Sequence, residues 1–125
     1  MSRKNSFFLL LAVLVTACSK NIDLPGFDES QWQSDRNGCE GSRIQMLDQM
    51  ERVKDQLKGL NQDEMVKVLG KPDKNELYKR NQKFFIYEIA GAKACTPPDE
   101  ASSYIYLSIR FNATGLAKEA MIYRE

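Results

Sequence analysis

A strict alternation of apolar and polar side chains constrains the fold of this chain more than any other feature. Residues 103–111 read SYIYLSIRF, and every second position from Ile105 to Phe111 is apolar. Neighbouring side chains of a β-strand point to opposite faces of its sheet. The run therefore predicts a strand with one buried face and one solvated face.

Three further segments supply neighbours for this strand. Residues 83–90 (KFFIYEIA) predict a strong strand, and residues 76–79 predict a weak one. A turn with Gly115 follows the alternating run, and residues 116–123 are expected to pair back beyond it. Residues 91–102 are long for a hairpin connection. The expected sheet is antiparallel and has three or four strands.

Two helices are predicted ahead of the sheet. Residues 43–58 form the first, and an apolar stripe with steps of three and four residues marks it: Met46, Met50, Val53, Leu57 and Leu60. The second helix begins after Asn61, where Glu64 completes a capping-box pattern, and it ends at Gly70 before Pro72. The stripe covers barely two heptads, which favours packing on the chain's own sheet over a seam with a partner helix. The predicted fold class is α+β, with two N-terminal helices on one face of the antiparallel sheet.

The first residues predict export from the cytoplasm. Arg3 and Lys4 form a short basic region, and the uncharged apolar run FFLLLAVLV follows at residues 7–15. A membrane-spanning helix needs about 20 apolar residues. The shorter run is typical of a secretory signal peptide, which we place at residues 1–17.

Residues 15–18 (VTAC) resemble the lipobox of bacterial lipoproteins. The resemblance implies cleavage before Cys18 and acylation of that cysteine, for example with palmitate, and several acyl chains anchor a protein where one cannot. An ordinary signal peptide with a chance cysteine is the alternative. Because Ser19 is not Asp, the same resemblance implies release to the outer membrane. We expect the anchored protein to face the periplasm. We expect residues 18–26 to be a lipidated tether and residues 27–125 to form a single domain.

Charge and composition argue against several function classes. The chain has 18 Lys and Arg against 17 Asp and Glu, which lacks the basic excess of a nucleic-acid-binding protein. It has no His, which removes Ser–His, Cys–His and His–metal chemistry. The sequence contains no Gly-rich phosphate loop, and its paired carboxylates fall in predicted caps and loops. We therefore expect no enzymatic activity, no cofactor and no metal site.

The two remaining cysteines, Cys39 and Cys95, predict one disulfide. Export places them in an oxidising compartment, and an even pair in a small secreted domain is typical of a bridge. Chain-entropy arithmetic gives up to ~4 kcal/mol of stabilisation for closing residues 39–95. A redox or metal pair is the alternative, but the sequence has no C-x-x-C and no further metal ligands beside these cysteines.

Residues 59–73 (GLNQDEMVKVLGKPD) resemble the signature of the SmpA/OmlA family of bacterial outer-membrane lipoproteins. Residues 107–112 (LSIRFN), followed by Gly115 and Leu116, are similar to the strand-turn-strand ending of that family. The resemblance covers about residues 59–123. It implies two helices on an antiparallel sheet, as also seen in β-lactamase inhibitor proteins, and a BamE-like role in outer-membrane protein assembly or envelope integrity. A periplasmic inhibitor or ligand-binding module on the same fold is the alternative.

Three aromatic residues are candidates for the surface that binds a protein partner in the envelope: Trp32, Tyr104 and Tyr106. Trp32 is interpreted as an anchor that packs residues 27–40 onto the fold, with a ligand platform as the alternative. Tyr104 and Tyr106 lie on the polar side of the alternating strand. That side is either a mixed polar-aromatic interface or a solvated face, and both interpretations stay open.

Overall fold

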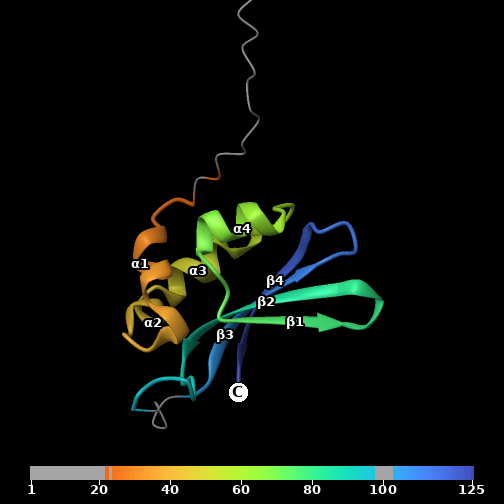
Figure 1. Ribbon diagram of the computed structural model, residues 1–125. Coiled ribbons are helices and arrows are strands. Elements are labelled where there is room, and N and C mark those ends of the chain that lie inside the picture. The colour runs from red at the N-terminus through yellow and green to blue at the C-terminus, as the bar shows by residue number, and fades with distance from the viewer. Residues whose placement is uncertain (1–21, 23, 98–102) are drawn as a thin grey trace, which may run out of the picture.

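The computed structural model describes residue 22 and residues 24–97 and 103–125, and it has an α+β fold with one four-stranded antiparallel sheet (Figure 1). The strands lie side by side in chain order: β1 (Lys74–Tyr78), β2 (Gln82–Ala90), β3 (Ile105–Phe111) and β4 (Ala117–Arg124). Each strand pairs antiparallel with the next one. The predicted strands are all present, and β1 and β4 form the two edges of the sheet.

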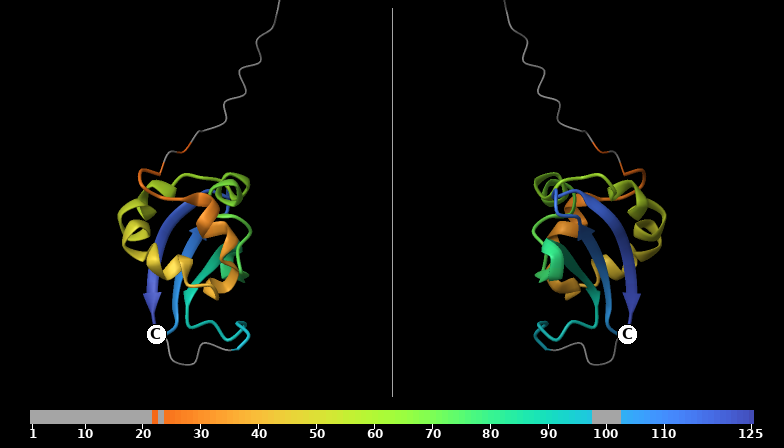
Figure 2. Two further views of the ribbon diagram at one scale, coloured as in Figure 1. Left: turned by 90° about the vertical axis from the view of Figure 1, so that its left-hand side faces the viewer. Right: turned by 90° about the vertical axis from the view of Figure 1, so that its right-hand side faces the viewer.

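The helices precede the sheet and gather on one of its faces (Figure 2). The α-helices are α1 (Glu29–Ser34), α2 (Ser42–Gln45), α3 (Leu47–Val53) and α4 (Gln62–Leu69). The short 3₁₀ turns are η1 (Arg36–Gly38), η2 (Lys54–Leu57) and η3 (Lys79–Asn81). The prediction of two helices is therefore wrong in number. Helix α1 has six residues and buries only Trp32, so it leaves no apolar stripe in the sequence.

The helix predicted over residues 43–58 is divided into α2, α3 and η2. The helix is interrupted at Met46, which has φ −93° and ψ 4°. From Lys54 the α-helix gives way to a 3₁₀ turn. Neither break coincides with a Gly or Pro, so the sequence carries no local sign of them. The apolar stripe survives the breaks, because all five of its side chains are buried: Met46, Met50, Val53, Leu57 and Leu60.

Helix α4 begins where the sequence predicts it. The Asn61 side chain accepts a hydrogen bond from the Glu64 amide at 2.8 Å, and the Glu64 carboxylate accepts one from the Asn61 amide at 3.0 Å. At the other end of the helix, Gly70 has φ 80° with an extended ψ, which is not the left-handed conformation common at helix C-termini. Gln33 of α1 caps this end instead, since its side-chain amide donates to the carbonyls of Lys67 and Val68.

The core lies between the helices and one face of the sheet. The strands contribute alternate residues to it: Phe85, Tyr87 and Ile89 from β2, and Leu107, Ile109 and Phe111 from β3. The alternation predicted for β3 is thus confirmed. Leu24 is also buried in this core and Ile22 packs against it. The end of the segment predicted as a tether therefore belongs to the folded body.

Candidate functional site

Strand β1 covers only part of the free edge of β2. The pairing of the two strands reaches Lys74 and Ile86 and goes no further, so the backbone of β2 beyond Ile86 needs other partners. The turn η1 lies against this stretch. Gly38 has φ 66°, and a Cβ atom there would collide with the carbonyl group of Ile89. The turn that contains Asn37 and Gly38 therefore sits directly on the strand.

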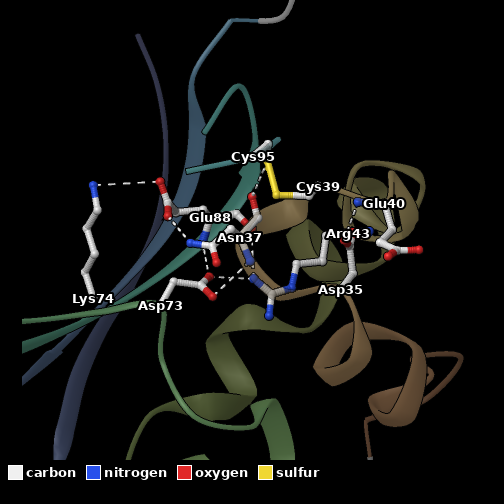
Figure 3. The surroundings of a disulfide bond; sticks show 9 residues. All are labelled: Asp35, Asn37, Cys39, Glu40, Arg43, Asp73, Lys74, Glu88 and Cys95. Carbon is white, nitrogen blue, oxygen red and sulfur yellow. Dashed lines mark hydrogen bonds and ion pairs between the residues drawn. A yellow bond between two sulfur atoms is a disulfide. The ribbon is translucent and has the colours of Figure 1, made fainter. Parts of the chain in front are cut away.

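A buried ion pair satisfies the uncovered backbone of β2 (Figure 3). The Asp73 carboxylate accepts a hydrogen bond from the Glu88 amide at 2.7 Å, and the Arg43 guanidinium donates to the Glu88 carbonyl at 2.9 Å. Arg43 and Asp73 bind each other at 2.6 Å, with side chains 1% and 0% exposed. The side chains of Arg43 and Asp73 therefore occupy the position at which a longer β1 would have paired with β2.

The surrounding polar groups hold this ion pair in place. The guanidinium of Arg43 also donates to the Trp32 carbonyl at 2.9 Å and lies 5.0 Å from the centre of the Trp32 ring system. Asp35 accepts hydrogen bonds from the amides of Glu40 and Arg43. The Asn37 amide donates to Asp73 at 3.0 Å. Each charged side chain of this cluster has a partner within the protein, which is typical of a structural network.

The predicted disulfide between Cys39 and Cys95 is present beside this network (Figure 3). The bridge joins the residue after η1 to the segment after β2, with 5.3 Å between the two Cα atoms. It pins the first part of the long 91–102 connection, of which residues 98–102 lie outside the described chain. The predicted pairing of Cys39 with Cys95 is therefore confirmed.

The opposite face of the sheet carries a group of aromatic side chains, which we call the tyrosine face. Its aromatic members are Tyr78, Phe84, Tyr104, Tyr106 and Tyr123. Together with their polar neighbours they line a hollow of about 350 Å³. Tyr78 is 61% exposed and Tyr123 is 41% exposed. Since the helices lie on the other side, none of the described helices covers this face (Figure 2).

The rings of the tyrosine face contact one another across the strands. Tyr106 of β3 stacks on Tyr123 of β4 with 5.4 Å between ring centroids, because the two residues are direct partners in the sheet register. The ring centroids of Tyr104 and Tyr106 are 5.0 Å apart. Tyr78 contacts Phe84 edge to face, with 5.2 Å between the ring centroids. These contacts form a preorganised aromatic surface rather than isolated exposed rings.

Carboxylates accompany the rings of the tyrosine face. The Tyr106 hydroxyl lies 3.4 Å from the Glu125 carboxylate, and Lys74 pairs with Glu88 at 3.7 Å. Partial burial, then the nearby Glu88 carboxylate, raise the pKa of Tyr104 well above its usual range. Desolvation and the Glu125 carboxylate likewise raise the pKa of Tyr106. Both phenols therefore stay neutral near pH 7 and act as hydrogen-bonding groups.

The structure brings together two of the three residues proposed for a partner surface. Tyr104 and Tyr106 both belong to the tyrosine face. Trp32 does not, because its side chain is 0% exposed and packs between Phe27 and Arg43. The anchor interpretation of Trp32 is confirmed, and its assignment to a partner surface is wrong. Cys18 lies outside the described residues.

Comparisons with protein-family models, with curated proteins and with solved structures yielded no match. Among the residues that the structure describes, no helix combines the length and apolar character needed to cross a bilayer. The resemblance of residues 59–73 to the SmpA/OmlA signature stays a prediction.

Proposed function

We propose that this protein is a lipid-anchored, non-enzymatic subunit of an outer-membrane complex that binds a protein partner through its tyrosine face. The observation that carries this proposal is the set of contacting aromatic rings on a sheet face that no described helix covers. Exposed aromatic surfaces with polar neighbours are typical of interaction sites on soluble domains. The buried charges near the disulfide bind one another, which supports a structural role for them over a catalytic one.

Two sequence features support the proposed location at the outer membrane. The lipobox-like residues 15–18 support acylation of Cys18, and the SmpA/OmlA-like residues 59–73 support a periplasm-facing location at the outer membrane. Together they favour a BamE-like supporting role in outer-membrane protein assembly or envelope integrity. The hollow of about 350 Å³ favours, as a second candidate, an inhibitor or ligand-binding module on the same fold.

The anchor is tested by Cys18→Ala. We expect metabolic labelling with a palmitate analogue to mark the wild type and not the variant, because the acylated sulfur is lost. The variant should accumulate as an uncleaved or soluble species. Cys39→Ala combined with Cys95→Ala is the matched control, since it removes the other two cysteines and should keep the label. Equal labelling of the wild type and Cys18→Ala would exclude lipidation at this residue.

The binding face is tested by photo-crosslinking in intact cells. A photoreactive amino acid at Tyr123 should give covalent adducts with a partner protein, because this side chain is exposed on the tyrosine face. The same group at Asp48, exposed on the helical side, is the control and should give none. Barrel-assembly subunits among the adducts would support the BamE-like role. A single soluble hydrolase would favour the inhibitor, and the absence of adducts at Tyr123 would contradict a protein-binding face.

A further inference from the structure

One part of the tyrosine face already holds a cationic group of the chain itself. The Lys74 ammonium lies 3.7 Å from the Glu88 carboxylate and 5.5 Å from the centroid of the Tyr104 ring. Its nitrogen is also 3.4 Å from the Tyr104 hydroxyl. The ammonium is thus placed between the hydroxyl end of the Tyr104 ring and a carboxylate, both of which attract positive charge. Figure 3 shows Lys74 reaching Glu88 from β1.

The neighbouring part of the hollow also has aromatic rings and carboxylates, but it holds no cation of the described chain. Tyr106 and Tyr123 present a stacked pair of rings, and Glu125 lies 3.4 Å from the Tyr106 hydroxyl. Glu76 of β1 lines the same hollow. Across the described residues, the ion pairs of the chain include neither Glu76 nor Glu125. These two carboxylates therefore have no cationic partner within the described protein.

The charge of the hollow is negative as a result. Two carboxylates, those of Glu76 and Glu125, line the hollow together with the single ammonium of Lys74, and that ammonium is already paired with the buried Glu88. The pKa of Tyr106 is consistent with this, since Glu125 and Glu76 both contribute to raising it after desolvation. Such a surface repels phosphate-bearing lipids and nucleic acids and attracts cations.

We propose that the tyrosine face binds an extended partner segment through a lysine or arginine side chain, which stacks on Tyr106 and Tyr123 within reach of Glu76 and Glu125. This proposal rests on the protein-binding function proposed above and names the chemistry of the partner. Arginine fits better than lysine, because its planar guanidinium stacks on a ring and can bind a carboxylate at the same time. The segment is extended because the site is a shallow hollow on an open sheet rather than a deep pocket.

The test compares two blocked peptides, Ala-Ala-Arg-Ala-Ala and the same peptide with citrulline in place of arginine. Citrulline has nearly the same shape and no charge. We expect the arginine peptide to shift the ring NMR signals of Tyr106 and Tyr123 saturably in the full mature protein, held in uncharged detergent. Its affinity should exceed that of the citrulline peptide by about tenfold, and it should weaken as salt is added.

The double variant Glu76→Gln and Glu125→Gln should remove most of this preference for arginine. Both residues are exposed, so the fold is expected to stay intact, and thermal unfolding checks this. Asp48→Asn, on the helical side, is the matched control and should bind the arginine peptide like the wild type. Unchanged binding by the double variant would overturn the proposal, as would equal affinity for the two peptides or no saturable shift with either peptide.

The two proposals fail in different ways. Photo-crosslinks from Tyr123 to a partner, together with no preference for the arginine peptide, would overturn the cationic segment and leave the protein-binding face standing. Absence of crosslinks would instead contradict the function on which the cationic segment rests.

Discussion

Replacing Arg43 with Met is expected to lower the free energy of unfolding by about 3–5 kcal/mol. Methionine has an apolar side chain of similar length to the stem of arginine, but it lacks the guanidinium. The Asp73 carboxylate, whose side chain is 0% exposed, then stays buried without its counter-charge. The Glu88 carbonyl also loses its donor on the edge of β2. An uncompensated buried charge is among the largest effects that a single substitution produces.

Arg110→Met is the matched control for this prediction. Arg110 pairs with Glu119 at 3.4 Å, and both side chains of that pair are partly exposed. Because water screens such a pair, its loss should cost at most about 1 kcal/mol. Urea unfolding of the wild type and both variants measures the difference. Equal and small losses in the two variants would show that the Arg43–Asp73 pair contributes no more than a surface pair does.

Hydrogen exchange should locate the damage caused by Arg43→Met. The Glu88 amide donates to Asp73 rather than to a neighbouring strand, so its protection depends on the ion pair. The amides that link β2 to β3 keep ladder partners of their own, so their protection should fall only as far as the global stability does, and the protection of the Glu88 amide should fall further. An equal loss of protection at Glu88 and across the sheet would contradict a local role at this edge.

The parts of the fold that the sequence predicts correctly are governed by local rules. The alternation of β3 depends only on the period of a strand, and the start of α4 depends on Asn61 and Glu64, which lie three residues apart. Tyr104 and Tyr106 could be placed on one face by the same alternation. Tyr123 could not be added to them from the sequence, because its position opposite Tyr106 follows from the register between two strands.

The buried network could not be predicted, because its members come from distant parts of the chain. Arg43 and Asp73 are separated by 30 positions and meet only after the helices have packed on the sheet. In the sequence both residues look like ordinary surface charges. The one available signal is the late start of β1 at Lys74, which leaves the edge of β2 beyond Ile86 uncovered. That signal becomes visible only once the register is known.

Breaking the Cys39–Cys95 disulfide is expected to lower the free energy of unfolding by about 4 kcal/mol. The bridge joins residues 56 positions apart, and its main effect in the chain-entropy model is to restrict the unfolded chain. Cys39→Ser and Cys95→Ser should each cost about as much as the double replacement, because each removes the same bond. A small domain has little stability to spare, so the melting temperature should fall clearly in all three variants.

The folded core should nevertheless survive the loss of this disulfide. The turn η1 stays attached to the sheet through the Asn37 amide, which donates to Asp73, and through the Asn37 side chain, which donates to Glu88. We expect extra mobility to be confined to the segment that follows β2, where Cys95 is the covalent attachment. Urea unfolding in a Cys18→Ser background measures the cost, and thiol counting on the denatured, non-reduced protein confirms the bond. Two reactive thiols per chain would exclude the disulfide, and a double variant much less stable than either single one would show that the cysteines contribute separately.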